Sequence, residues 1–346
     1  MAIEFARERR DFNFVLILSG GNALGAFQAG AYEALNEAGL EPDWVIGASA
    51  GAMNGAIIAG NDPAARLAKL ADLWRPRRGR QPLPSRHLGR TIEILRRSAA
   101  AHWTMTAGRL GVFGPILSGA GTPAIFETSQ MVSNLDTLVD FERLNRGNVR
   151  FTATSVDIES GEDVLFDTDR DVLGPQHVRA SAALPVAFPP VEIDGRWLAD
   201  GGLSANLPVD PFFASPPAIP TLCIAIDLLP LAGRRPRTLG DAATRMQDLL
   251  FATQSHRSMT RWKDHYQRRQ GENLPGISFL RLAYEAPDTE ISGKAMDFSP
   301  RSVGDRWDAG KAEMERLIDG LGRFALPIRK TGIAMFDGRT QKEMVA

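Results

Sequence analysis

Cysteine is almost missing from this chain of 346 residues, which contains only Cys223. A single cysteine excludes an intrachain disulfide and a cysteine-ligated zinc site. Excess charge of either sign is also missing, since 40 Lys and Arg stand against 41 Asp and Glu, and nothing in this balance indicates nucleic-acid binding. Histidine is scarce, with five in the chain, and no histidine–carboxylate cluster has metal-ligand spacing. We therefore expect no metal and no cofactor.

Long apolar runs are missing too. No stretch approaches the 18 or so uninterrupted apolar residues of a membrane-spanning helix. The charged residues 1–10 lack the apolar centre of a signal peptide. We therefore expect a cytoplasmic protein that reaches a membrane only at its surface.

The order of apolar runs and turns predicts an α/β fold. The run 14–18 is typical of a parallel strand buried on both faces, and a helix is expected over about 24–38. A second strand at 42–46 and a second helix from about 52 to 60 follow directly. Two strand–helix units in succession indicate a parallel sheet.

Later segments continue this alternation. The predicted strands lie at about 149–156, 163–166, 191–200 (a hairpin), 221–229 and 277–282. The predicted helices lie at about 176–184, 239–269 and 303–321. On the second of these helices the apolar residues Met246, Leu249 and Leu250, together with Thr253, fit one helix face.

Residues 75–123 differ from the rest of the chain. Nine arginines lie between Arg75 and Arg109 against the single acid Glu93, and Trp103 and Phe113 are interleaved with them. We expect a helical basic insertion that projects from the core. It is either a solvated basic face or a lid that meets anionic lipid headgroups.

A serine motif follows the second predicted strand. Gly47, Ser49 and Gly51 form a G-x-S-x-G pattern between that strand and a run of small residues. A sharp strand-to-helix turn exposes a serine hydroxyl, and the positive end of the next helix stabilises an anion beside it. The same pattern also fits a serine that caps a helix, so it needs support from other segments.

A glycine-rich turn follows the first predicted strand. It contains Gly20, Gly21, Asn22 and Gly25, and its backbone N–H groups can form a nest for a phosphate or an oxyanion. No lysine followed by serine or threonine closes it, so it is not a P-loop. A third segment, with Asp200, Gly201 and Gly202, ends the predicted hairpin 191–200. Taken alone, it reads as a turn.

Together these three segments resemble the patatin-like phospholipase family, as do the stretches 180–190 and 206–209. The resemblance covers about residues 12–230. It implies a three-layer α/β/α core over 10–230, mostly parallel, with the insertion at 75–123. Residues 231–346 form a C-terminal extension of strand plus helices, in which 296–299 and 306–310 resemble an extension of one bacterial branch.

The resemblance also implies a chemistry. Ser49 attacks an ester carbonyl of a phospholipid or other lipid, and Asp200 accepts the serine proton. N–H groups of Gly21 and Asn22, joined by Gly20, bind the oxyanion. The chain departs from the family pattern at Asn22, which replaces a glycine, and at Leu24, where many relatives carry an arginine.

Three alternatives stay open. One is a Ser–His–Asp hydrolase, in which the histidine follows the acid; only His256 and His265 lie after Asp200. The others are a non-catalytic lipid-binding protein and an acyltransferase that uses the same dyad. The preferred function is lipid acyl-ester hydrolysis, with peripheral membrane contact through 75–123. The sequence does not indicate the oligomeric state.

Overall fold

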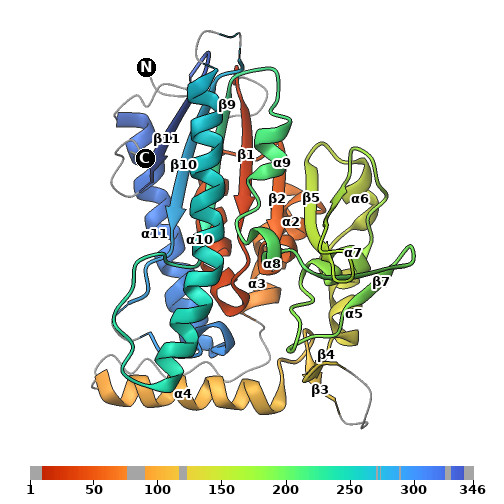
Figure 1. Ribbon diagram of the computed structural model, residues 1–346, viewed down its shortest axis with the longest axis vertical. Helices are drawn as coiled ribbons and strands as arrows, with labels where there is room; N and C mark the ends of the chain where they lie inside the picture. The colour runs from red at the N-terminus through yellow and green to blue at the C-terminus, as the bar shows by residue number, and fades with distance from the viewer. Residues whose placement is uncertain are drawn as a thin grey trace.

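The computed structural model describes residues 10–75, 90–116, 123–269, 272, 274–287, 290–323 and 329–338. A central mixed sheet runs through these residues, with helices on both faces (Figure 1). Its strands, with the separate pair β3 and β4, are β1 (Asn13–Leu18), β2 (Trp44–Ala48), β3 (Gly114–Pro115), β4 (Phe126–Glu127), β5 (Arg150–Asp157), β6 (Asp163–Asp167), β7 (Val191–Ile193), β8 (Arg196–Asp200), β9 (Thr221–Asp227), β10 (Ile277–Ala283) and β11 (Ile333–Asp337).

The helices connect and cover these strands. They are α1 (Gly25–Glu37), α2 (Ala50–Ala59), α3 (Pro63–Trp74), α4 (Arg90–Ala107), α5 (Ser129–Leu138), α6 (Phe141–Arg146), α7 (Pro175–Ser181), α8 (Gly202–Ala205), α9 (Asp210–Ala214), α10 (Leu239–Arg268) and α11 (Pro300–Arg323), with the short 3₁₀ helices η1 (Asn22–Leu24) and η2 (Lys294–Met296). Local sequence sets several boundaries. For example, the Thr238 hydroxyl accepts from the Asp241 N–H at the start of α10, and Asp62 with Pro63 begins α3.

The sheet has the order β11-β10-β9-β1-β2-β5-β8-β7, and β6 pairs with β5. Neighbours from β11 to β5 are parallel, whereas β6 and β8 are antiparallel to β5. Alternate residues of β1 enter two cores: Phe14 and Leu16 pack on the side of α1 and α11, and Val15 packs on the side of α9 and α10. The predicted three-layer, mostly parallel α/β/α fold is confirmed.

The C-terminal segment contributes directly to this core. β10 and β11 extend the sheet beyond β9, although the sequence predicted only the first of them. Helix α11 packs against α1 at backbone distance: a Cβ built on Gly30 would lie 1.8 Å from the Trp307 carbonyl oxygen, and one on Gly310 would lie 1.9 Å from the Phe27 carbonyl oxygen. The boundary at residue 230 stays a prediction, because the sheet is continuous across it.

Helices α10 and α4 lie on the outside of the molecule (Figure 1). Met246, Leu249 and Leu250 lie on one face of α10, as the periodicity predicted, and this face is exposed. The predicted helical insertion is a helix over α4, whereas 108–116 form turns, an Arg109–Phe113 bridge and β3, and 76–89 and 117–122 lie outside the described residues. Among the described helices, none combines the length and apolar character needed to cross a bilayer.

Candidate active site

Ser49 sits in a strained turn between β2 and α2. Its backbone has φ 55° and ψ −121°, outside the regions that non-glycine residues usually adopt. The turn is possible because its glycines let backbones meet: a Cβ on Gly47 would lie 2.4 Å from the Gly51 carbonyl oxygen. The Ser49 N–H donates to the backbone oxygen and hydroxyl of Ser181, both at 3.1 Å. Helix α2 begins at the next residue and directs its positive end toward the serine.

The sheet brings Asp200 to this serine. Ala48, the last residue of β2, pairs with Thr154 of β5, and Asp200, the last residue of β8, pairs with Ser155. Because β6 occupies the other edge of β5 over 152–156, β2 and β8 follow one another along the same edge. Ser49 and Asp200 therefore meet where two strands end, which no local pattern in the sequence specifies.

Asp200 is buried and has no cationic partner among the described residues. Its side chain is 3% exposed. Burial raises the pKa of Asp200 from 3.8 to about 6, while hydrogen bonds from the Ser49 hydroxyl and the Gly202 N–H lower this pKa in part. The Gly202 bond measures 2.7 Å. A carboxylate in this state is a stronger base than an ordinary aspartate and still ionised at neutral pH.

Gly201 and Gly202 allow this tight arrangement. A Cβ on Gly201 would lie 2.3 Å from the Thr154 hydroxyl oxygen, and one on Gly202 would lie 2.9 Å from Asp200 Oδ1. Gly201 therefore lets the turn approach Thr154, and Gly202 leaves room for the Asp200 carboxylate.

The glycine-rich loop faces the serine. A Cβ on Gly20 would lie 3.2 Å from Ser49 Cβ, so only a glycine lets the loop approach this closely. The N–H groups of Gly21 and Asn22 donate to no carbonyl in the described part of the chain. Asn22 has φ 51°, the left-handed conformation that asparagine tolerates better than most residues.

Two residues of this loop do not match the expected role. The Gly20 N–H donates to the Asn206 carbonyl at 3.0 Å and is therefore not free to bind an oxyanion, which corrects that part of the prediction. Gly25 begins α1, where a Cβ would lie 2.6 Å from the Trp74 ring. Gly25 leaves room for the Trp74 ring, and no contact with Ser49 or Asp200 is found in the described structure.

Sequence reasoning missed residues that join these segments. Asn206 is buried and donates its side-chain amide to the Gly20 carbonyl at 3.3 Å, so it connects the D-G-G segment to the glycine-rich loop. Arg306 of α11 is buried as well and donates to the Ala23 carbonyl at 3.3 Å and the Lys294 carbonyl at 3.0 Å. The stretches 206–209 and 306–310 had been noted by resemblance, but their contacts with the loop depend on tertiary structure.

The described end of the insertion also packs near the loop. The Arg109 guanidinium lies 4.2 Å from the ring centre of Phe298 and 5.0 Å from that of Trp74. The ring centres of Phe113 and Phe298 are 6.1 Å apart. Trp74 in turn fills the space beside Gly25. The insertion and the C-terminal segment thus meet on the side of the glycine-rich loop.

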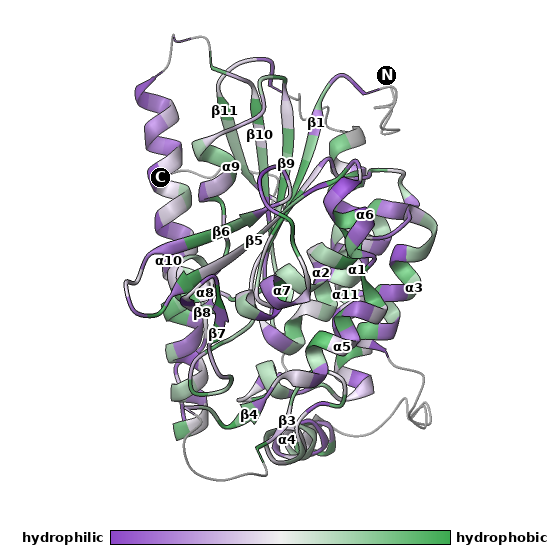
Figure 2. Cartoon of the chain, turned by 90° about the vertical axis from the view of Figure 1, so that its right-hand side faces the viewer, coloured by the Kyte–Doolittle hydropathy of each residue, from purple (hydrophilic) through white to green (hydrophobic). Residues whose placement is uncertain are grey.

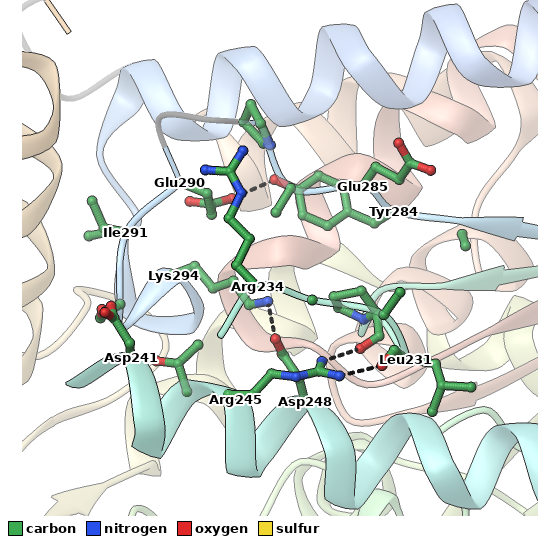
Figure 3. Close-up of a pocket in the computed structure, with 18 of the residues that line it drawn as sticks. Leu231, Arg234, Asp241, Arg245, Asp248, Tyr284, Glu285, Glu290, Ile291 and Lys294 are labelled. Atoms are coloured by element: carbon green, nitrogen blue, oxygen red, sulfur yellow. Dashed lines mark hydrogen bonds and ion pairs between the residues drawn. The ribbon is translucent and has the colours of Figure 1, made fainter. Parts of the chain in front are cut away.

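A separate cavity of about 1800 Å³ lies at the carboxyl ends of β9 and β10 (Figure 3). Its wall includes the paired side chains Lys294 and Asp248, 2.8 Å apart, and Arg245, which donates to the Pro230 carbonyl at 3.0 Å. Ser49 and Asp200 do not line it, and its charged wall is unsuited to an acyl chain.

No histidine contact completes a triad in the described part of the chain. His256 is exposed on α10, and His265 packs against Trp262 and Tyr266. Neither hydrogen bonds to Asp200 in the described contacts. Among the described residues, no group of His, Cys, Asp and Glu could hold a metal ion.

Comparisons with solved structures return chains of low similarity. VipD from Legionella pneumophila aligns with a TM-score of 0.43 and 16% identity, over 90% of this chain and 67% of VipD. ExoU, in complex with SpcU from the type III secretion system of Pseudomonas aeruginosa, aligns with a TM-score of 0.30 and 20% identity, over 74% of this chain and 52% of that chain.

Sequence comparisons are more direct. Uncharacterized NTE family proteins of Mycobacterium bovis and Mycobacterium tuberculosis are 27% identical over 201 residues, which is 57% of this chain and 44% of theirs. The chain thus matches less than half the length of these curated relatives. The family description that matches residues 16–213 is patatin-like phospholipase, and that span includes Ser49 and Asp200. The chain belongs to the patatin-like phospholipase family.

Proposed function

We propose that this chain hydrolyses acyl esters of phospholipids or other lipids with a dyad formed by Ser49 and Asp200. One observation carries the proposal: a serine in a strained turn meets a buried carboxylate whose pKa is raised to about 6. Membership of a lipid-hydrolase family supports the class of substrate.

The first half of the reaction forms an acyl-enzyme. Ser49 Oγ attacks the ester carbonyl carbon while its proton moves to an Asp200 carboxylate oxygen. The carbonyl oxygen becomes an oxyanion, for which the N–H groups of Gly21 and Asn22 are free donors. The carbon–oxygen bond to the leaving alcohol then breaks, and Asp200 returns the proton to that alcohol.

The second half releases the acyl group. A water molecule gives its proton to Asp200 and attacks the acyl carbon, and the bond to Ser49 Oγ breaks as the serine recovers a proton. Loss of a single oxyanion donor typically costs about 3–4 kcal/mol of transition-state stabilisation. The loop formed by Gly21 and Asn22 is therefore as important to this proposal as the dyad.

The histidine contacts favour the dyad over a triad. His256 points to solvent and His265 is held among aromatic rings, so the base that meets Ser49 is Asp200. A His256→Ala/His265→Ala double variant should keep wild-type turnover.

The test is hydrolysis of p-nitrophenyl acyl esters of rising chain length. We expect turnover that increases with chain length and that Ser49→Ala and Asp200→Asn abolish. Ser204→Ala is the matched control, because Ser204 is an exposed serine of the nearby helix α8. No turnover by the folded wild type on any ester would contradict the proposal, and turnover retained by Ser49→Ala would move the nucleophile elsewhere.

Peripheral membrane contact through 75–123 is a second part of the proposal. Its sequence is basic, with nine arginines against one acid between Arg75 and Arg109. The described part of this segment, α4 and residues 108–116, offers a more specific surface.

A further inference from the structure

Helix α4 reverses the usual amphipathic arrangement of a surface helix. An ordinary surface helix turns its apolar face to the core and its charged face to water. Here the buried side chains include Glu93, Arg97 and Thr104. Arg97 donates to Glu93 at 3.0 Å and pairs with Asp305 of α11, so ion pairs hold the helix to the body of the protein.

The outer face of α4 is apolar. Ile92, Leu95 and Trp103 recur at helical spacing on the side opposite the buried charges, and Leu95 and Trp103 are 64% and 71% exposed. Arg96 lies on the same face and has no ion pair in the described structure. A tryptophan among leucines and an arginine is the composition of helices that lie in a membrane interface.

The N-terminal half of α10 repeats the inversion. Its inner side carries Asp248, paired with Lys294 in the charged cavity, and Arg245 (Figure 3). Its outer side carries Met246 and Leu250, which are 61% and 58% exposed. The sequence periodicity identified this face correctly, and the structure leaves it uncovered.

Helix α4 and the start of α10 lie at one end of the molecule, with α10 running upward roughly across the direction of α4 (Figure 1). Figure 1 shows α4 crossing the end toward which the parallel strands run, with the first turns of α10 reaching the same end, and Figure 2 shows the same placement from the side. This is also the end of the sheet at which Ser49 follows β2. An interface that covers both helices therefore lies on the catalytic side of the protein.

The charge of this end is complementary to an anionic surface. Arg235 and Arg237 are exposed just before α10, and Leu239, which follows them, is 88% exposed. The one acid of α4, Glu93, is buried against Arg97. On α4 the exposed Arg96 therefore has no acid beside it, whereas at the start of α10 Asp241 lies next to Arg237 and accepts from its N–H. Exposed arginines of this kind attract anionic headgroups.

We infer that the outer faces of α4 and of the first half of α10 form one docking surface for an anionic phospholipid bilayer. Arg96, Arg235 and Arg237 meet headgroups, and Leu95, Trp103, Met246 and Leu250 enter the interface. The buried ion pairs replace the apolar packing that these helices give up. The inference rests on the proposed membrane contact through 75–123, which it makes specific, and does not depend on the proposed hydrolysis.

The test is co-sedimentation of the full chain with phosphatidylglycerol vesicles and with phosphatidylcholine vesicles. Ser49→Ala is used throughout, so that no lipid is hydrolysed and failure of catalysis cannot imitate failure of binding. We expect stronger binding to phosphatidylglycerol, weakened by salt, and a loss of about tenfold or more in Leu95→Asp/Trp103→Asp. Leu250→Asp should also weaken binding.

Ile219→Asp is the matched control, because Ile219 is exposed in the turn before β9, at the opposite end of the sheet. It should bind as tightly as the parent. Quenching by brominated lipid provides a second measurement if an aspartate variant fails to fold: Trp103→Phe should remove most of the quenched fluorescence. Equal binding of Ile219→Asp and Leu95→Asp/Trp103→Asp would overturn the inference, as would a lipid-free dimer that the latter variant abolishes.

Discussion

Two of the regions that bury charged side chains differ in the partners that they provide. Between α4 and α11 the buried cation Arg97 meets Glu93 and Asp305. At the active site Asp200 is buried with a hydroxyl and a backbone N–H but no cation in the described structure. The first arrangement joins two elements, whereas the second keeps a carboxylate at a raised pKa. Burial alone therefore does not distinguish the two regions; the difference lies in the counter-charge, which Arg97 has and Asp200 lacks among the described residues.

Arg97→Met breaks the first arrangement. It removes the cation that lies 3.0 Å from Glu93 and 3.9 Å from Glu290, although Glu93 keeps Arg301 at 3.2 Å and Glu290 keeps Arg306 at 3.0 Å. The free energy of unfolding should therefore fall by about 3 kcal/mol. Urea denaturation measures this. Arg96→Met on the same helix removes an exposed arginine and should change stability by no more than about 0.5 kcal/mol. Equal effects of the two variants would contradict the assigned role of the ion pairs.

Asp200→Asn removes the buried charge of the second arrangement. Because burial raises the pKa of Asp200 from 3.8 to about 6, the ionised carboxylate destabilises the folded state above that pH by about 3 kcal/mol. The variant should therefore be more stable than the wild type at pH 8 and should lose this advantage as the pH falls through 6 toward 4. A variant less stable than the wild type at pH 8 would show that the carboxylate is not strained by burial.

The α1–α11 contact sharpens the comparison, because glycines bring two backbones together there while the ion pair of Lys311 with Glu33 is partly exposed. Gly310→Ala places a methyl group 1.9 Å from the Phe27 carbonyl oxygen and should lower the free energy of unfolding by about 1–3 kcal/mol. Gly304→Ala, on the same helix with nothing nearby, should instead stabilise by about 0.5–1 kcal/mol. Urea midpoints of the two variants should move in opposite directions, and a shift of both in one direction would contradict close packing at Gly310.

The pH dependence of hydrolysis tests the raised pKa of Asp200 in the reaction itself. Ester turnover should rise about tenfold per pH unit below 6 and level off above it, because Asp200 must be ionised to accept the serine proton. The profile of kcat/KM on a soluble ester measures this, and a midpoint near 4 would indicate an ordinary, solvated carboxylate.

Much of the site could be predicted from sequence because its parts are local. The serine turn needs Gly47 and Gly51 within four residues, and the Asp200 turn needs the two glycines that follow it. The sequence could not reveal that Asn206 and Arg306 hold the glycine-rich loop, because those contacts join segments far apart in the chain.

The fold was predicted with the same limit. Buried strands such as β1 and β9 are continuous apolar runs, and the long helices α10 and α11 have clear boundaries. Periodicity identified the apolar face of α10 but not whether that face points to the core or to solvent. A helical period identifies a face and not the neighbour that covers it. Ion pairs on the opposite side decide the direction here.

The most direct test of the dyad is covalent labelling of the folded protein with a fluorophosphonate, followed by peptide mass spectrometry. The account predicts one adduct, on Ser49, that is formed by the wild type and by His256→Ala/His265→Ala and is strongly slowed in Asp200→Asn. An adduct on another residue, or labelling of Ser49 at the wild-type rate in Asp200→Asn, would contradict it.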